Sequence, residues 1–140
     1  MTRIFFFHGA GDRVQLAAEW LGKICLAKQQ ATAFAPQRDV ADRLDRLLWQ
    51  PATGFLPHCR ADSPLATDTP ILIAERLDSL VQDQRLLNLS NEVPAEFARF
   101  EELVEIVSTD ESDKIGARDR YRYYRERGYE LHNRDVSGGI

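Results

Sequence analysis

The residues best suited to chemistry lie near the carboxyl end of this 140-residue sequence, in the stretch ARDRYRYYRERGY from Ala117 to Tyr129. The stretch holds five arginines and four tyrosines in thirteen residues. Between Lys114 and Arg127 there are six basic and two acidic residues, a local balance of +4 in a chain whose net charge is −4. A positive cluster this local indicates an anion-binding site, whereas a nucleic-acid-binding surface would normally make the whole domain basic.

On a helix of 3.6 residues per turn, this region separates into a row of cations and a neighbouring face of rings. The row, named the cation stripe, comprises Lys114, Arg118, Tyr121, Arg122 and Arg125. The adjacent face comprises Ala117, Tyr121, Tyr124 and Gly128, which leaves Arg120 and Arg127 outside the stripe. Guanidinium groups bind carboxylates through paired hydrogen bonds and rings supply a desolvated wall, so the stripe could hold an anion with an apolar companion. A solvated face with Asp119 and Glu126 as local partners is the alternative, and the sequence leaves both open.

Other candidate chemistry is weaker. Gly9-Ala10-Gly11 follows an expected strand, as the glycine fingerprint of a dinucleotide-binding fold does, but the third glycine position is Val14. His8 lies near Asp12 in the sequence, yet no nucleophile motif accompanies them. The two cysteines stand alone and the three histidines are not at metal-ligand spacing. We therefore expect no catalysis, no metal and no cofactor.

The composition fits one soluble globular domain, with 44% hydrophobic and 29% charged residues. No apolar run approaches the roughly 20 residues that cross a bilayer, and the start MTRIFFFHGAGD lacks the pattern of a signal peptide. We therefore expect a cytoplasmic protein without membrane contact. The domain is expected to span residues 1–132, with a flexible tail over residues 133–140.

Strand and helix patterns alternate along the chain. Strands are expected at Arg3–His8, Ala31–Ala35, Ile71–Ala74, Arg85–Leu89 and Glu101–Val107. Helices are expected from Val14 to about Gln29 after an Asp12 cap, over Asp39–Trp49, in a short piece from Pro94, and from near Asp110 to Gly128. This order predicts a three-layer α/β domain with a mostly parallel sheet of about five strands.

The segment WQPATGFLPH, from Trp49 to His58, sets large apolar side chains among two prolines and a glycine, where a surface connection is expected. Such a segment is either a docking surface for a partner or a cover for the core. The sequence leaves both interpretations open.

Three motifs carry a resemblance to a known family: RLDRLLWQPATGFLPH, RLLNLSNEVPAEFARFEELVEIV and DKIGARDRYRYYRERGYEL. Together they resemble the chi subunit of bacterial DNA polymerase III, over essentially the whole chain. The resemblance implies a Rossmann-like fold without nucleotide chemistry. It also implies a non-catalytic accessory subunit that bridges the clamp loader, through the psi subunit, to the acidic carboxyl-terminal tail of single-stranded DNA-binding protein during DNA replication. DNA would be contacted only indirectly.

The resemblance also assigns residues to both partners. The pocket for the acidic tail matches Lys114, Arg118, Tyr121, Arg122 and Arg125, with Arg118 forming the salt bridge to the terminal carboxylate. Val107 matches the apolar wall for the last ring of the tail, and Trp49 is expected to border the site. The psi-binding surface is placed at Phe55, Leu56, Pro57 and His58. The sequence departs from the pattern in a link between Trp49 and Pro51 that is one residue shorter, and in Gly116, where a larger apolar residue would strengthen the helix.

Two other functions compete with this interpretation. The Arg/Tyr stretch could bind single-stranded nucleic acid directly, with rings for stacking and cations for phosphates. The overall acidity of the chain counts against that function. A nucleotide-dependent enzyme would rest only on Gly9-Ala10-Gly11.

Overall fold

The computed structural model describes residues 1–50, 56–78, 80 and 82–140. Its helices are α1 (Arg13–Leu26), α2 (Arg38–Leu48) and α3 (Glu111–Glu126). Its strands are β1 (Arg3–Ala10), β2 (Ala31–Phe34), β3 (His58–Arg60), β4 (Ile71–Ala74), β5 (Arg85–Asn88), β6 (Glu102–Ser108) and β7 (Glu130–Asp135). Single 3₁₀ turns lie at Ala66–Asp68 and Phe97–Arg99.

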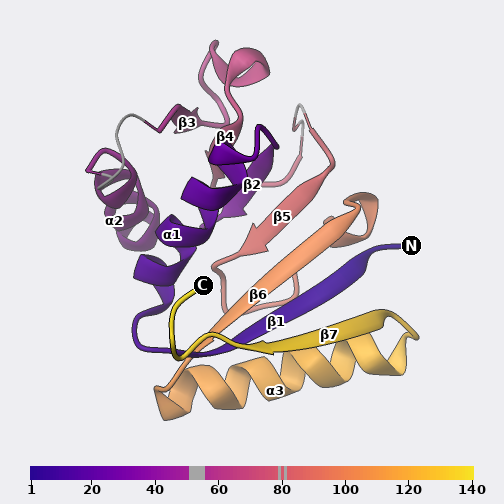
Figure 1. Cartoon of the computed structure of the whole chain (residues 1–140). Helices are drawn as coiled ribbons and strands as arrows, with labels where there is room; N and C mark the ends of the chain where they lie inside the picture. Colours follow the sequence, from indigo (N-terminus) through magenta and orange to yellow (C-terminus); the bar gives the residue numbers. More distant parts are fainter. Residues whose placement is uncertain (51–55, 79, 81) are drawn as a thin grey trace.

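The strands form one sheet in the order β3-β4-β2-β5-β6-β1-β7, and every pairing among them is parallel. Figure 1 shows the sheet twisting between α1 and α2 on one face and α3 on the other. The prediction of a three-layer α/β domain with a mostly parallel sheet is therefore confirmed. The strands β3 and β7 form the two edges.

Side-chain alternation along β6 shows how one strand serves both layers. Val104 and Ile106 join the core beneath α1 and α2, whereas Leu103 and Val107 join the core beneath α3. Both faces of a parallel sheet are buried in this way, which is why such strands read as nearly continuous apolar runs. Each helix packs one buried row of side chains on its face of the sheet, and α3 adds Ala117 and Tyr124 to the second core.

Two aspartates cap α1 and α3 where the sequence predicts the starts of these helices. The Asp12 carboxylate accepts hydrogen bonds from the backbone N–H groups of Val14 and Gln15 at the start of α1. The Asp110 carboxylate accepts one from the N–H of Ser112 at the start of α3. These bonds satisfy donors that the first helical turn leaves without an intrahelical acceptor. Within the described ranges, no helix is long and apolar enough to cross a membrane.

Gly9 lies within β1, one residue before the end of the strand. Its φ of +85° lies in the left-handed region, where the ladder between β1 and β6 shifts register between His8 and Ala10. A Cβ on Gly9 would lie 3.0 Å from Oδ1 of Asp135. The strand thus continues through Ala10, and Gly9 forms a bulge that lets the backbone lie close to the end of β7.

Three expectations about the elements were wrong. The sheet has seven strands rather than about five, because β3 and β7 were missed. The tail expected to be flexible from residue 133 instead supplies the second half of β7, and Val136 beyond it is 2% exposed and donates its N–H to the carbonyl of His8. The short helix expected from Pro94 is only the 3₁₀ turn at Phe97–Arg99.

Candidate functional site on helix α3

The buried seam of α3 contains a charged residue that the helical wheel did not place. Ala117 and Tyr124 point into the core, as expected for the tyrosine face, and Tyr124 is fully buried. Arg120, which the wheel left outside the stripe, is only 5% exposed and belongs to the same seam. Gly128 lies beyond the helix end with a φ of +80°.

Arg120 enters the core because Glu105 is there to receive it. Glu105 lies on β6 with 0% exposure, and its Oε1 accepts a hydrogen bond from Nε of Arg120 at 3.1 Å. Its Oε2 accepts from the Tyr124 hydroxyl at 2.7 Å and from Nδ2 of Asn88 at 2.9 Å. A buried carboxylate is tolerated only when it is paired and hydrogen-bonded in this way. This cluster fixes the rotation of α3 on the sheet and thereby decides which side chains face solvent.

Arg13 completes the cluster from the other layer. Its Nη2 lies 3.9 Å from Glu105 Oε1, and it donates to the backbone carbonyls of Asn88 and Ser90. Its Nε donates to the carbonyl of Ile106. The start of α1 is thus tied to the carboxyl ends of β5 and β6, the region where a nucleotide would lie in a dinucleotide-binding fold.

Tyr124 is held in its protonated form by this environment. Burial raises the pKa of the Tyr124 hydroxyl far above its usual value, and the negative charge and hydrogen bond of Glu105 add to the shift. The hydroxyl therefore serves as a permanent donor to the carboxylate. Among the described residues, every buried side-chain nitrogen or oxygen has a hydrogen-bond partner. The cluster is accordingly a structural anchor that leaves no buried polar atom free to bind a substrate.

The cation stripe lies on the flank of α3 that the anchor leaves outside. Arg118, Arg122 and Arg125 are exposed, and Lys114 is half-buried. Within the described part of the chain, the one carboxylate within 4.0 Å of any of these cations is Asp119, whose Oδ1 lies 3.9 Å from Nη1 of Arg122. The sequence left open whether local carboxylates occupy the stripe. The geometry shows that Lys114, Arg118 and Arg125 form no such ion pair there.

Tyr121 joins the stripe to the sheet. Its ring meets Phe6 of β1 edge to face with centroids 5.0 Å apart, and its hydroxyl accepts a hydrogen bond from Nδ2 of Asn133 at 3.2 Å. Because Asn133 is on β7, the flank that carries the stripe lies beside the edge strand.

Ile115, which the sequence interpretation missed, lies about one turn before Arg118, and its side chain is 53% exposed. The sequence signal for it was an apolar residue on the polar side of the helical wheel.

The two residues assigned to the rim of the stripe lie in different layers of the domain. Val107 faces α3 and belongs to the same core as Ala117, although only 8% of it is exposed. Trp49 directly follows α2, whose buried side chains belong to the core on the opposite face of the sheet. The expectation that Trp49 borders the stripe is therefore corrected, because it lies in the other helical layer.

Trp49 instead lies beside the segment that was assigned to psi binding. Its ring meets the His58 ring edge to face with centroids 4.7 Å apart, and Trp49 is 59% exposed. His58 also lies 3.1 Å from Asp45 Oδ1 and 2.8 Å from the carbonyl of Leu56. The sequence left open whether this segment docks a partner or covers the core, and Leu56 and His58, which are 6% and 8% exposed, are buried. Pro57 is intermediate, and Phe55 lies outside the described residues.

Comparison with known sequences decides the family. The profile described as "DNA polymerase III chi subunit, HolC" matches residues 1–132. The chain belongs to this family. A DNA polymerase III subunit chi from Pseudomonas aeruginosa is 26% identical over 136 residues, which cover 94% of each chain. Another from Haemophilus influenzae is 32% identical over 95 residues, which cover 66% of each chain.

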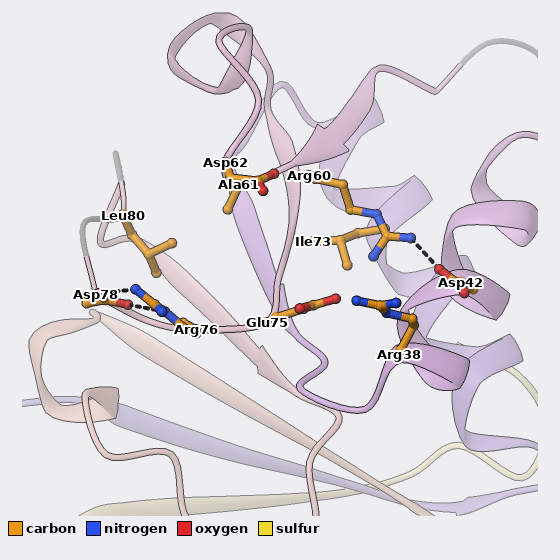
Figure 2. A pocket seen from close by; sticks show the side chains of 10 residues that line it. All are labelled: Arg38, Asp42, Arg60, Ala61, Asp62, Ile73, Glu75, Arg76, Asp78 and Leu80. Atoms are coloured by element: carbon orange, nitrogen blue, oxygen red, sulfur yellow. Dashed lines mark hydrogen bonds and ion pairs between the residues drawn. The ribbon is translucent and has the colours of Figure 1, made fainter.

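This chi-family chain also has a polar pocket of about 800 Å³ at the carboxyl ends of β3 and β4 (Figure 2). Its charged lining comprises Arg38, Asp42, Arg60, Asp62, Glu75, Arg76 and Asp78. Arg60 donates to Asp42 at 2.8 Å and Arg76 pairs with Asp78 at 3.0 Å, while Arg38 and Glu75 point toward each other in Figure 2. The lining charges thus largely balance one another, and the pocket favours neither anions nor cations.

Asp12, the other candidate for chemistry in the chi-family chain, stabilises the fold. It caps α1 and forms an ion pair with Arg43 of α2, and the hydrogen bond from Arg43 lowers the pKa of the Asp12 carboxyl. His8 is exposed on β1, where its backbone pairs with Val107 and Asp135. Across the described ranges, no three His, Cys, Asp or Glu side chains form a group that could hold a metal.

Proposed function

We propose that this chi-family subunit of the replicative polymerase is an adaptor that binds the acidic carboxyl-terminal tail of single-stranded DNA-binding protein through the cation stripe of α3. Support comes from family membership and, above all, from one observation: Lys114, Arg118 and Arg125 project from a helix whose own carboxylates do not pair with them. Cations left unpaired on an acidic protein favour an acidic partner.

Arg118 lies at the centre of the proposed site. Its guanidinium can bind the terminal carboxylate of the tail through two parallel hydrogen bonds, which a lysine could not match in geometry. Tyr121 forms the wall toward the sheet, and Ile115 offers apolar surface one turn away for the last side chain of the tail. Arg122 and Arg125 then meet the acidic residues that precede the end.

Fluorescence anisotropy tests this site directly. The probe is a labelled peptide of aspartates that ends in Phe with a free carboxylate, titrated with the native chain and with Arg118→Ala. We expect a loss of about tenfold or more, since one charge-assisted pair is removed. Arg46→Ala is the matched control, because it removes the same charge from an exposed position on α2 in the other layer. Equal affinities for the native chain and Arg118→Ala would contradict the proposal.

The psi subunit is proposed as the second partner, on the face around Trp49 and Pro57. Leu56 and His58 pack inside the chain behind this face and do not contact psi, because both side chains are buried in the chain itself. An exposed tryptophan at the end of a helix is the kind of anchor that dominates protein interfaces. The chain would thereby join the clamp loader to the coated DNA strand, in the cytoplasm, without performing catalysis or binding DNA itself.

Co-purification tests the second partner. The chain is expressed with a tagged psi subunit, and Trp49→Ala should reduce recovery of the complex severalfold. Leu26→Ala, which changes a side chain that is 74% exposed on α1, should leave recovery unchanged. If both variants recover psi like the native chain, psi does not dock through Trp49.

Direct binding of single-stranded DNA is less well supported. A stacking platform needs rings open to solvent, but Tyr124 is fully buried and Tyr121 and Tyr129 meet other rings edge to face. Tyr123 is covered by the guanidinium of Arg127, 3.5 Å from its ring centroid. A bare oligonucleotide should therefore show no anisotropy change even at low salt, where charge attraction is strongest.

A further inference from the structure

The free edge of β7 lies beside the cation stripe and has a row of open backbone groups. β7 pairs with β1 from Arg3↔Glu130 to His8↔Asp135, and no described strand pairs with its other side. All but one of its six side chains are exposed, and Leu131 is half-buried. An open strand edge can accept one more strand through main-chain hydrogen bonds.

The register shows which backbone groups point outward. The N–H of Val136 donates to the carbonyl of His8, so this residue faces β1. In a parallel ladder, alternate residues direct both their N–H and C=O to the same neighbour. Residues 130, 132 and 134 therefore face β1 as well, whereas Leu131, Asn133 and Asp135 present their N–H and C=O groups to the open edge.

The stripe follows this edge along its length. Tyr121 is level with Asn133, which its hydroxyl contacts. Because α3 connects two parallel strands, it runs antiparallel to β7. Arg118 therefore lies about 4.5 Å from Tyr121 toward the carboxyl end of β7, and Arg125 about 6 Å toward its amino end. Together they span about three residues of an extended strand.

We propose that the acidic peptide held at Arg118 adds to β7 as an eighth, parallel strand. This inference rests on the proposed function and gives its binding mode. The peptide enters near Arg125 and ends at Arg118, so its direction follows that of β7. Alternate side chains of the added strand then project toward α3, where carboxylates meet Arg122 and Arg125, while the next ones point to the other face of the sheet.

The charges of β7 fit this occupant better than a second copy of the chain. Glu130, Arg134 and Asp135 put charges of both signs along the edge, and such charges keep edges of identical copies apart. The net attraction for an acidic strand comes instead from α3, because the cation stripe contains four basic residues. An extended peptide with aspartates at every second position satisfies both constraints.

Amide hydrogen exchange followed by NMR on the full ¹⁵N-labelled chain tests the binding mode. The probe is a synthetic peptide of alternating Asp and Ala that ends in Phe with a free carboxylate. We expect added protection at the amides of Leu131, Asn133 and Asp135. The amides of residues 130, 132 and 134 in the same strand are the internal control, because their bonds to β1 exist already.

A second measurement uses peptides of equal composition. Shifting every Asp by one position relative to the Phe end moves the carboxylates to the other face of an added strand. The original and the shifted peptide should therefore differ severalfold in affinity. If the peptide binds, loses affinity in Arg118→Ala and yet leaves the three outward amides unprotected, strand addition is overturned and the proposed function stands. If no peptide binds at all, both are overturned. Uniform protection of all six amides would also overturn strand addition.

Discussion

Replacing Arg120 by methionine should destabilise the fold far more than replacing any arginine of the cation stripe. Methionine keeps the unbranched aliphatic stem but removes the guanidinium that donates to Glu105 at 3.1 Å. The carboxylate, which is 0% exposed, would retain its bonds from Tyr124 and Asn88 and the distant charge of Arg13 at 3.9 Å. Its main counter-charge would be gone.

The expected cost follows from that partial compensation. Breaking a buried ion pair by removing one partner costs about 3–5 kcal/mol, and the three remaining contacts favour the lower end, about 3 kcal/mol. Native domains are stable by about 5–15 kcal/mol in total, so Arg120→Met removes a large share of the margin. At roughly 3 °C per kcal/mol for a chain of this size, the melting temperature should fall by about 10 °C.

Urea unfolding followed by circular dichroism provides the assay. The midpoint should fall in Arg120→Met with the slope unchanged, whereas Arg122→Met on the exposed flank should differ from the native chain by less than about 0.5 kcal/mol. The double variant Glu105→Gln/Arg120→Met should recover part of the loss, because the buried carboxylate that Arg120→Met leaves without its main counter-charge is replaced by a neutral amide, while Arg13 keeps its hydrogen bonds to backbone carbonyls. If Arg120→Met and Arg122→Met cost the same, the anchor described for α3 is refuted.

Two further outcomes follow from individual residues. Gly9→Ala should destabilise the chain by about 1–3 kcal/mol in urea unfolding, because the left-handed φ and the Asp135 contact both oppose a Cβ. Gly11→Ala, where a Cβ meets no atom within 4 Å, is its control, and equal midpoints for the two variants would contradict the assignment of a bulge. Tyr124 should make stability fall with alkaline pH: its folded pKa is raised above the ordinary value of 10.0, so its contribution is complete below pH 10 and is lost as pH rises beyond it. Tyr124→Phe should flatten the difference in urea midpoint between pH 9 and pH 11 relative to the native chain, and an identical decline in both proteins would contradict this reasoning.

Local patterns predicted most of the fold because they are short-range. Asp12 and Asp110 precede apolar periodic segments, and a side chain that caps a helix needs only its next three residues. The five interior strands were visible because burial on both faces makes them apolar throughout. The sequence ELHNRD of β7 has no such run, since an edge strand exposes most of its side chains, and β3 is only three residues long.

The site was harder to predict because its decisive contacts link distant positions. The stripe could be drawn from helical periodicity alone, but nothing local distinguishes Arg120 from its neighbours. The available signal was Glu105, a carboxylate between Leu103 and Val107 on the buried side of β6, which requires a buried cation from elsewhere. Trp49 failed for a related reason, because sequence order does not say which face of the sheet a helix covers.

Arg120 of α3 is buried whereas the arginines of the cation stripe are exposed, because one acidic residue, Glu105, lies in the core. Glu105 draws Arg120 into the core, and once that contact fixes the rotation of the helix, Arg118 and Arg125 must point outward on the flank beside β7. Their exposure then depends on the anchor: without Glu105 the helix could turn to bury apolar surface and pair its cations locally. The stripe is therefore preorganised for a ligand by an ion pair that never contacts it, so loss of the anchor should weaken peptide binding even where the chain remains folded. Peptide affinity in the Glu105→Gln/Arg120→Met double variant, compared with Arg46→Ala at equal folded fraction, separates this coupling from mere unfolding. An unchanged affinity would show that the stripe needs no anchor to hold its geometry.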